Sequence, residues 1–339
     1  MTRKALPNTE DLRLGILKGD RVLLSRAITL IESQLPEHRA AADRLLESLI
    51  NRPEKKSIRI GITGTPGVGK STFIEVFGSE LTRLGRKVAV LPVDPSSIKS
   101  KGSILGDKTR MDKLSNDPNA YIRPSPTGKT LGGVTRKTRE TILLCEAAGF
   151  DAIIVETVGV GQSETTVRQM VDFFLLLLLP GSGDELQGIK RGIMEMADAI
   201  AVNKTDGDNL QKSQLAARQY QHALHLMPPA ESRWEVPVLT CSAMEEKGIS
   251  DIWGKIVDYQ NLTEENGFFH KNRARQTLQW FDQNINQLLE DHFISRIKKQ
   301  LNLEQLKDDV AQGKTSINHA LAAVRLALTN LESDHSRGT

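Results

Sequence analysis

Residues Gly64–Thr72 read GTPGVGKST, a complete phosphate-binding loop of the pattern G-x-x-x-x-G-K-[ST]. The preceding SIRIGIT segment (57–63) is rich in β-formers, and residues 73–84 after the loop have helical spacing. The glycines let successive N–H groups point inward and form an anion site at the start of a helix. Lys70 can reach the β- and γ-phosphates, and the Ser71 hydroxyl can ligate Mg²⁺. The loop therefore predicts nucleoside triphosphate binding by Gly64, Thr65, Pro66, Gly67, Val68, Gly69, Lys70, Ser71 and Thr72.

Composition and charge limit the classes of function. The chain has 339 residues, 39% apolar and 26% charged, which fits one large core with smaller appended segments. The net charge is only +3 and aromatic residues make up 4%, which argues against a nucleic-acid-binding surface. The two cysteines, Cys145 and Cys241, indicate small buried residues in a reducing cytosol rather than a disulfide or a metal motif.

The sequence shows neither a targeting signal nor a membrane span. Its first residues, MTRKALPNTEDLRLG, lack an apolar region and carry acidic residues early. The most apolar run, Phe173–Leu179, is too short to cross a bilayer and is followed by Pro180-Gly181. Such a run is typical of a buried strand in a parallel sheet. We therefore predict a cytoplasmic protein that does not associate with membranes.

Short apolar strands alternate with helical segments from Ser57 onward, which predicts an α/β P-loop NTPase fold with a mostly parallel central sheet. The predicted strands are Ile58–Thr63, Val88–Val93, Ala152–Glu156, Phe173–Leu179, Ala199–Asn203 and Val238–Cys241. Ligands of such sheets bind at the carboxyl ends of the strands. We expect an N-terminal helical segment over 1–56, the P-loop domain over 57–261 and a C-terminal helical segment over 262–339.

The C-terminal segment carries two amphipathic stripes at helical spacing. They consist of Leu278, Phe281, Ile285, Leu288, Leu289, Phe293 and Ile297, followed by Ile317, Leu321, Val324 and Leu328. These helices either pack back on the P-loop domain or pair with a second copy in a two-fold homodimer. The sequence leaves both arrangements open.

The tetrapeptide Asn203-Lys204-Thr205-Asp206 follows the strand AIAV and matches the N-K-x-D pattern of guanine recognition. The Asp206 carboxylate can accept hydrogen bonds from guanine N1–H and the 2-amino group, whereas adenine would leave it unpaired. Asn203 is expected to hold the loop and reach N7, and the Lys204 stem to cover the base. Ser242-Ala243 follows a later strand and matches the loop whose backbone supports guanine O6. The predicted nucleotides are GTP and GDP.

Three carboxylates at strand ends or in a glycine-rich loop are candidates for the Mg²⁺ site with Ser71, because Mg²⁺ prefers hard oxygen ligands. Asp94 follows VAVLPV, Asp107 lies in GSILGDKT, and Glu156 follows AIIV. Glu156 stands where most GTPases place the Asp of D-x-x-G, here reading ETVG, so residues 156–164 are a candidate nucleotide switch.

The residue that positions the attacking water is not obvious from the sequence. Many GTPases carry a glutamine after the D-x-x-G glycine, but this chain has Val160 there. The candidate catalytic residues are Lys70, Glu156, Gln162 and Lys190. We expect slow intrinsic GTP hydrolysis that accelerates when a partner reorders these loops.

The strings GTPGVGKST, VDPSS, GSILGDKTRM, ETVGVGQSE, GSGDELQGIK and NKTD occur in this order and resemble the MeaB/ArgK family. These are GTPase chaperones of methylmalonyl-CoA mutase, related to the human methylmalonic aciduria type A protein. The resemblance is dense over residues 57–260, and Lys101 departs from the small residue usual before GSILGDK. It implies a dimer formed through the C-terminal helices and a role in loading or protecting adenosylcobalamin in the mutase.

The resemblance also implies roles for individual residues. Lys70, Ser71 and Thr72 match the phosphate-loop positions, and Asp94, Asp107 and Glu156 match the magnesium-linked acids. Asn203, Lys204 and Asp206 match the base-reading positions, and residues 181–190 match the loop thought to communicate with the mutase.

The leading hypothesis is a GTP-driven chaperone of a cobalamin-dependent mutase, in which cobalamin is bound only through the partner. Two alternatives belong to other classes. A nickel-type metallochaperone GTPase would need His or Cys ligands at metal spacing, and the chain offers only the His222 and His225 pair. A phosphotransferase acting on a protein would need a base to activate a hydroxyl, and no loop clearly supplies one.

Overall fold

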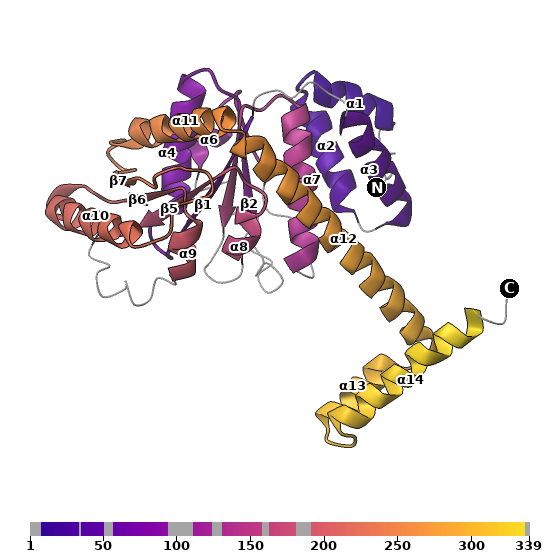
Figure 1. The fold of residues 1–339 in the computed structure, drawn as a ribbon. Helices are drawn as coiled ribbons and strands as arrows, with labels where there is room; N and C mark the ends of the chain where they lie inside the picture. The colour runs from indigo at the N-terminus through magenta and orange to yellow at the C-terminus, as the bar shows by residue number, and fades with distance from the viewer. Residues whose placement is uncertain are drawn as a thin grey trace. The chain divides into compact units, whose positions relative to one another are not determined.

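A computed structural model of the chain describes residues 8–33, 35–50, 57–93, 111–123, 131–157, 163–180 and 191–335. The chain forms two compact units, residues 1–273 and residues 274–339. Unit 1 contains the sheet and the N-terminal helices, and unit 2 contains the C-terminal helices (Figure 1).

Seven parallel strands form the sheet of unit 1, which confirms the predicted α/β P-loop NTPase fold. The strands are β1 (Ile58–Gly64), β2 (Val88–Val93), β3 (Ala120–Ile122), β4 (Ala152–Thr157), β5 (Phe173–Leu178), β6 (Ala199–Val202) and β7 (Val238–Thr240). Their order is β3-β2-β4-β1-β5-β6-β7, so β1 lies at the centre between β4 and β5. The strand absent from the prediction, β3, has only three residues and no detectable periodicity.

Helices cover both faces of the sheet, and the alternation of side chains along β1 separates the two faces. Ile60 and Ile62 pack toward α4 (Lys70–Arg83) and α11 (Ile249–Glu265), which lie side by side in Figure 1. On the opposite face lie α7 (Leu131–Ala147) and α8 (Ser163–Arg168). The helices α9 (Arg191–Met196) and α10 (Leu210–His225) pack on β5, β6 and β7. Two further short elements in the described residues are α6 (Asp112–Ser115) and the 3₁₀ turn η2 (Gly207–Asn209).

The N-terminal helices α1 (Thr9–Leu17), α2 (Arg21–Glu32) and α3 (Pro36–Ile50) share one core with α7. Asp20 caps α2, because its carboxylate accepts from two backbone amides of the first turn. Glu32, at the end of α2, forms an ion pair with Arg123 at 2.6 Å, and its carbonyl accepts from Lys137. The helices therefore pack against the α7 face of the sheet (Figure 1).

A partly buried ionic cluster lies at the amino-terminal ends of β1 and β5. The Asp172 carboxylate accepts the Arg59 amide of β1 at 2.9 Å and receives the Arg273 guanidinium at 2.7 and 2.8 Å. Arg59 in turn makes two 2.8 Å hydrogen bonds to Glu146 of α7. Arg273 belongs to the first turns of α12 (Phe268–Gln300). The cluster thus fixes the start of α12 at the amino-terminal ends of these strands. The sequence motifs follow the opposite, carboxyl-terminal ends.

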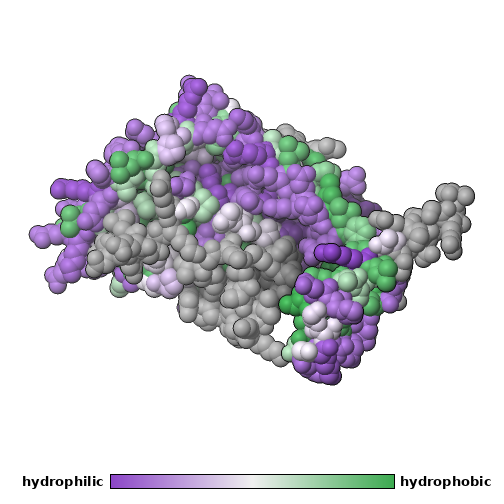
Figure 2. Space-filling model, turned by 60° about the horizontal axis from the view of Figure 1, so that its bottom comes forward, coloured by the Kyte–Doolittle hydropathy of each residue, from purple (hydrophilic) through white to green (hydrophobic). Residues whose placement is uncertain are grey.

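Unit 2 consists of the rest of α12 together with α13 (Leu303–Ala311) and α14 (Ile317–His335). Few of its apolar side chains are buried; they include Ile297, Ala320 and Ala327. Many more are exposed: Leu278, Phe281, Ile285, Leu288, Leu289, Phe293, Ile294, Ile317, Leu321 and Leu326. Figure 2 shows such hydrophobic surface, in green, interspersed with hydrophilic residues. Within the described residues, no helix combines the length and apolarity that crossing a bilayer requires.

Gly61 of β1 generates the first prediction, because α8 and the residues after it pack directly on this glycine. A Cβ at position 61 would lie 2.7 Å from Phe174 Cδ2, 3.0 Å from Val171 Cγ2 and 3.1 Å from Val167 Cγ1. Gly61→Ala should therefore lower the free energy of unfolding by about 1–3 kcal/mol through overpacking. Urea unfolding followed by circular dichroism measures this change.

Gly254→Ala is the matched control, since a Cβ at position 254, inside α11, meets nothing within 4 Å. This substitution should raise the unfolding free energy by roughly 0.5–1 kcal/mol, because alanine favours a helix. An unchanged urea midpoint for Gly61→Ala would contradict the close approach of α8 to β1.

Candidate functional site

The phosphate-binding loop follows the central strand and leads directly into α4. Val68 is fully buried in the core below the loop and anchors it. Gly69 is the N-cap of α4 with φ of 90°, a left-handed conformation that favours glycine. Because glycine has no capping side chain, the first amides of α4 stay available to an anion. At the other end of the loop, a side chain on Gly64 would collide with the Leu177 carbonyl of β5.

Lys70 lies at the start of α4, and its ammonium donates to the Gly64 carbonyl at 2.8 Å. Desolvation lowers the pKa of Lys70, and the negative charges of Glu156 and Glu164 oppose that shift. Glu156 and Glu164 are 5% and 1% exposed, so both carboxylates that act on the lysine are buried. An ammonium held at the loop by this arrangement can bind the β- and γ-phosphates.

Ser71 and Glu156 present two hard oxygen donors of the kind that magnesium prefers. The Ser71 hydroxyl lies 3.4 Å from Glu156 Oε1, at the end of β4. A hydroxyl and a carboxylate are hard oxygen donors, so this pair fits Mg²⁺ beside a bound triphosphate. The other two predicted ligands, Asp94 and Asp107, lie outside the described residues. Across the ranges that the structure describes, no group of three or more His, Cys, Asp or Glu residues could hold a metal.

The loops after β6 and β7 bring the predicted base-reading residues together. The Ser242 hydroxyl donates to Asp206 Oδ2 at 2.5 Å, and Ser242 Oγ accepts the Glu245 amide at 3.1 Å. Asp206 is therefore held in one orientation, with its other oxygen atom available for a ligand. Lys204 is exposed and has φ of 61°, a left-handed conformation rare outside glycine. The backbone thus turns sharply between Asn203 and Asp206.

Asn203 connects the base-reading loops to the phosphate loop. It is 1% exposed; its Nδ2 donates to the Val68 carbonyl at 2.8 Å, and its Oδ1 accepts the Ala243 amide at 3.1 Å. A Cβ on Gly69 would lie 3.2 Å from the same Nδ2. The N-K-x-D pattern predicts that Asn203 holds its loop but gives no sign of the bond to Val68, since that contact joins residues 135 positions apart.

The structure brings together Lys70, Ser71 and Glu156, and separately Asn203, Asp206, Ser242 and Ala243. The predicted catalytic residues Gln162 and Lys190, and the loop 181–190, lie outside the described residues. The sequence places Glu164 in a candidate switch segment but indicates no role for it at the site. Its burial depends on how α8 packs on the sheet, and no local sequence pattern predicts that packing.

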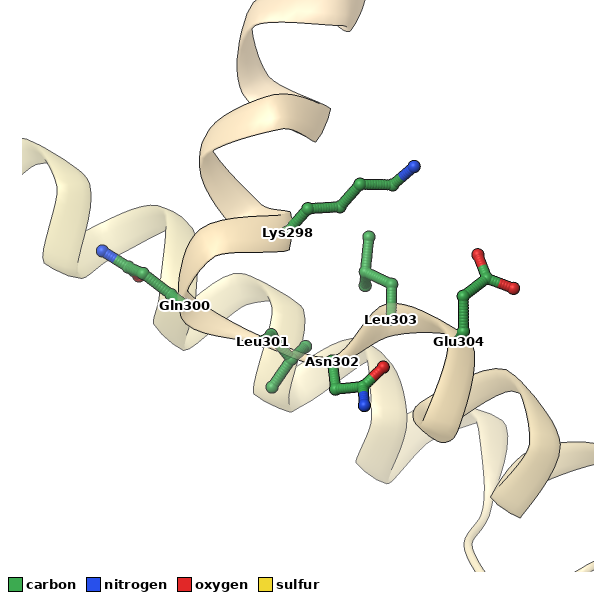
Figure 3. A pocket seen from close by; sticks show the side chains of 6 residues that line it. All are labelled: Lys298, Gln300, Leu301, Asn302, Leu303 and Glu304. Carbon is green, nitrogen blue, oxygen red and sulfur yellow. The ribbon is translucent and has the colours of Figure 1, made fainter.

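A crevice of about 440 Å³ lies at the junction of α12 and α13 within unit 2 (Figure 3). Its lining residues are Lys298, Gln300, Leu301, Asn302, Leu303 and Glu304. In Figure 3 the Lys298 and Glu304 side chains extend to the same side as Leu303. None of the residues predicted to contact nucleotide or metal lines this crevice, so it is separate from the candidate site.

The phosphate loop follows the central strand, and the buried Asn203 links it to the loop that carries the Asp206 carboxylate. This combination defines a P-loop GTPase. Comparison with known proteins agrees with this class. Residues 24–298 match the family described as Methylmalonyl Co-A mutase-associated GTPase MeaB. The chain belongs to this MeaB family and is a GTP hydrolase.

Named relatives cover most of the chain. It is 52% identical to a putative GTPase of Caulobacter vibrioides, over 84% of this chain and 86% of that protein. It is 47% identical to GTPase ArgK of Escherichia coli, over 82% and 84% of the two chains. The mouse mitochondrial methylmalonic aciduria type A homolog is 45% identical over 88% of this chain and 74% of that protein.

A solved structure described as a LAO/AO transport system kinase has the same fold. It superposes with a TM-score of 0.75 at 36% identity, covering 97% of this chain and all of that one.

The contacts of Asp206 generate the second prediction. Asp206→Ala should lower GTP affinity at least about 100-fold and leave ATP affinity nearly unchanged, because it removes the acceptor for both guanine donors. Ser242→Ala should lower GTP affinity only about 3- to 10-fold, since the carboxylate stays and loses one orienting hydrogen bond. Competition of GTP and ATP against a fluorescent GDP analogue measures both.

Equal losses for the two variants, or a retained preference for GTP in Asp206→Ala, would show that another group reads the base. Thr240→Ala is a suitable control, because Thr240 lies in the adjacent strand β7 and makes none of these side-chain contacts.

Proposed function

We propose that this GTPase is a chaperone of an adenosylcobalamin-dependent mutase of the methylmalonyl-CoA type, and that GTP hydrolysis gates loading or protection of the cofactor. The observation that carries the proposal is the match to a family described as mutase-associated, over residues 24–298. The mitochondrial relatives named for methylmalonic aciduria support the same metabolic setting. Cobalamin interacts with this protein only through the mutase.

Magnesium and the chain's own residues have different roles at the phosphates. Ser71, Asp94, Asp107 and Glu156 are the residues proposed to hold Mg²⁺, directly or through water. The metal would neutralise charge on the β- and γ-phosphate oxygens. Lys70 and the amides of Gly64–Thr72 bind the phosphates, and Asp206 selects guanine while Asn203 holds the two loops together.

Hydrolysis in the isolated protein is proposed to be slow. Val160 cannot orient water. The candidates for that role, Gln162 and Lys190, precede and follow β5 in the sequence. A partner that positions either residue would accelerate turnover by the preorganisation of the attacking water.

The protein is proposed to act as a homodimer formed through unit 2. Exposed leucine and phenylalanine side chains recur along α12, with Leu278, Phe281 and Leu288 each more than 60% exposed. A helix with this much exposed apolar surface is typical of an interaction surface, and a second copy presents a self-complementary stripe.

The two alternatives have less support. His222 and His225 lie on α10, and within the described part of the chain no metal-binding group of three residues includes them. This disfavours a nickel-delivery role. The similar solved structure is named as a kinase, but that name belongs to that protein, and hydrolysis by this chain needs no acceptor substrate. Transfer of the γ-phosphate to a protein would reveal a phosphotransferase.

The third prediction tests the chaperone role. GTP turnover should rise at least about tenfold when a purified methylmalonyl-CoA mutase is added, because the bound partner positions Gln162 or Lys190 for the attacking water. Phosphate release measured with and without the mutase, and with ATP in place of GTP, gives the result. Lys70→Ala controls for contaminating phosphatase, since it removes the phosphate-binding ammonium.

The absence of both stimulation and a complex in size-exclusion chromatography would overturn the chaperone role. It would leave the GTPase assignment intact. Radiolabel appearing on a protein rather than as inorganic phosphate would favour the phosphotransferase.

The fourth prediction concerns the dimer. Leu288→Asp should convert a dimer to a monomer by light scattering, because it places a charge in the proposed interface. Leu288 is 62% exposed within the single chain, so the substitution should change folding stability little. Leu215→Asp, at a 59% exposed leucine of α10, is the matched control and should leave the mass unchanged. A monomeric native protein would refute the dimer.

A further inference from the structure

The side chain of Thr65, in the phosphate loop, has an unusual environment. Its hydroxyl oxygen is buried, although the residue as a whole is partly exposed. Among the residues that the structure describes, this hydroxyl has no hydrogen-bond partner. Most buried polar side chains in folded proteins have one, because an unpaired buried donor is costly. A buried hydroxyl without a partner is explained if a bound ligand supplies that partner.

The backbone around this hydroxyl is held in place. The Thr65 carbonyl accepts the Val68 amide at 3.2 Å, which closes a four-residue turn. Pro66 and Gly67 occupy the two central positions, and Gly67 has φ of 79°, as a type II turn requires. Threonine is β-branched and has few side-chain conformations. The Thr65 hydroxyl is therefore confined to a small region beside the turn.

The Lys70 ammonium relates this region to the nucleotide. It donates to the Gly64 carbonyl at 2.8 Å and lies 3.5 Å from the Thr65 carbonyl oxygen. The amides of such loops bind the α- and β-phosphates, whereas the lysine reaches the β- and γ-phosphates. Thr65 thus lies at the part of the loop nearest the proposed γ-phosphate position. A Cβ on Gly67 would meet nothing within 4 Å, so the turn has open space beside it.

The composition of the turn gives a chemical reason for a hydroxyl at this position. Phosphate loops bind phosphate oxygens mainly through backbone N–H donors. Pro66 has no N–H, so this loop lacks a backbone donor there. A hydroxyl can donate to an anionic oxygen, and such charge-assisted bonds are among the stronger hydrogen bonds. Thr65 can therefore supply a donor next to the position where the backbone has none.

We propose that the Thr65 hydroxyl donates to an oxygen of the γ-phosphate, so that this side chain favours GTP over GDP. The hydroxyl is unpaired in the nucleotide-free protein and gains its partner only when a γ-phosphate is bound. The inference rests on the proposed placement of the phosphates at this loop and does not depend on the mutase.

Thr65→Val tests the proposal, because it removes the hydroxyl and keeps the branched shape. The variant should bind GTPγS about tenfold more weakly than the native protein, as expected for loss of a hydrogen bond to a charged group. Its GDP affinity should change less than about twofold, since GDP lacks the γ-phosphate. Thr65→Ser keeps the hydroxyl and should retain the native preference. Isothermal titration with Mg²⁺ present measures these affinities.

The stability of the nucleotide-free protein supplies a second readout. Thr65→Val should raise the midpoint of urea unfolding, because it replaces an unpaired buried hydroxyl by a methyl group. A purely structural role would give the opposite sign, since the hydroxyl would then lose a partner. Thr82→Val is the matched control, because the Thr82 hydroxyl, near the end of α4, donates to the Ser79 carbonyl at 3.1 Å. This control should change neither affinity and should not raise the midpoint.

Equal losses of GTPγS and GDP affinity in Thr65→Val, or no loss of either, would overturn the proposal, as would a lower urea midpoint. Lys70→Ala separates this failure from a failure of the phosphate subsite. Native GTPγS affinity in Lys70→Ala would show that the phosphates bind elsewhere and would refute both. If Lys70→Ala loses affinity and Thr65→Val does not, only the role of the hydroxyl is refuted. If Thr65→Val does not fold, Thr65→Ala replaces it in the same affinity comparison.

Discussion

The geometry of the site depends on the buried amide of Asn203. Its two polar atoms bind the Val68 carbonyl and the Ala243 amide, so a single side chain fixes three loops that follow β1, β6 and β7. With 1% exposure, each of these groups would be costly to leave unpaired. The parallel sheet makes this possible, because it delivers the carboxyl ends of all three strands to one edge. The distance between the proposed phosphate and base subsites is thus set by a contact within the protein.

Electrostatics at the phosphate subsite follow from the same edge of the sheet. The N-terminal end of α4 supplies partial positive charge, and Lys70 supplies a full one in a partly desolvated position. Glu156 and Glu164 compensate that charge from two different elements. Their charges oppose the effect of desolvation on the Lys70 pKa.

The sequence was sufficient to predict those features that depend on a local motif or a local periodicity. The phosphate loop, the N-K-x-D tetrapeptide and six strands could be predicted because each is read from consecutive residues. The strand β3 could not, since three residues carry no period. Nor could the long-range contacts, since the pairs Asn203 with Val68 and Asp172 with Arg273 depend on packing between distant segments. The sequence also gives no sign that position 61 requires glycine, because this depends on the close approach of Val167.

The boundary between the two units has a physical origin in α12. Before the boundary the helix is held, because Phe268 and Phe269 are buried and Arg273 makes a bidentate ion pair with Asp172. Beyond it, Leu278 and Phe281 are 65% and 61% exposed. A long helix is marginal in water without an apolar face to bury, and α13 and α14 cover little of this one. The proposed homodimer would cover these side chains, because a second copy of the same helix presents a surface of matching chemistry.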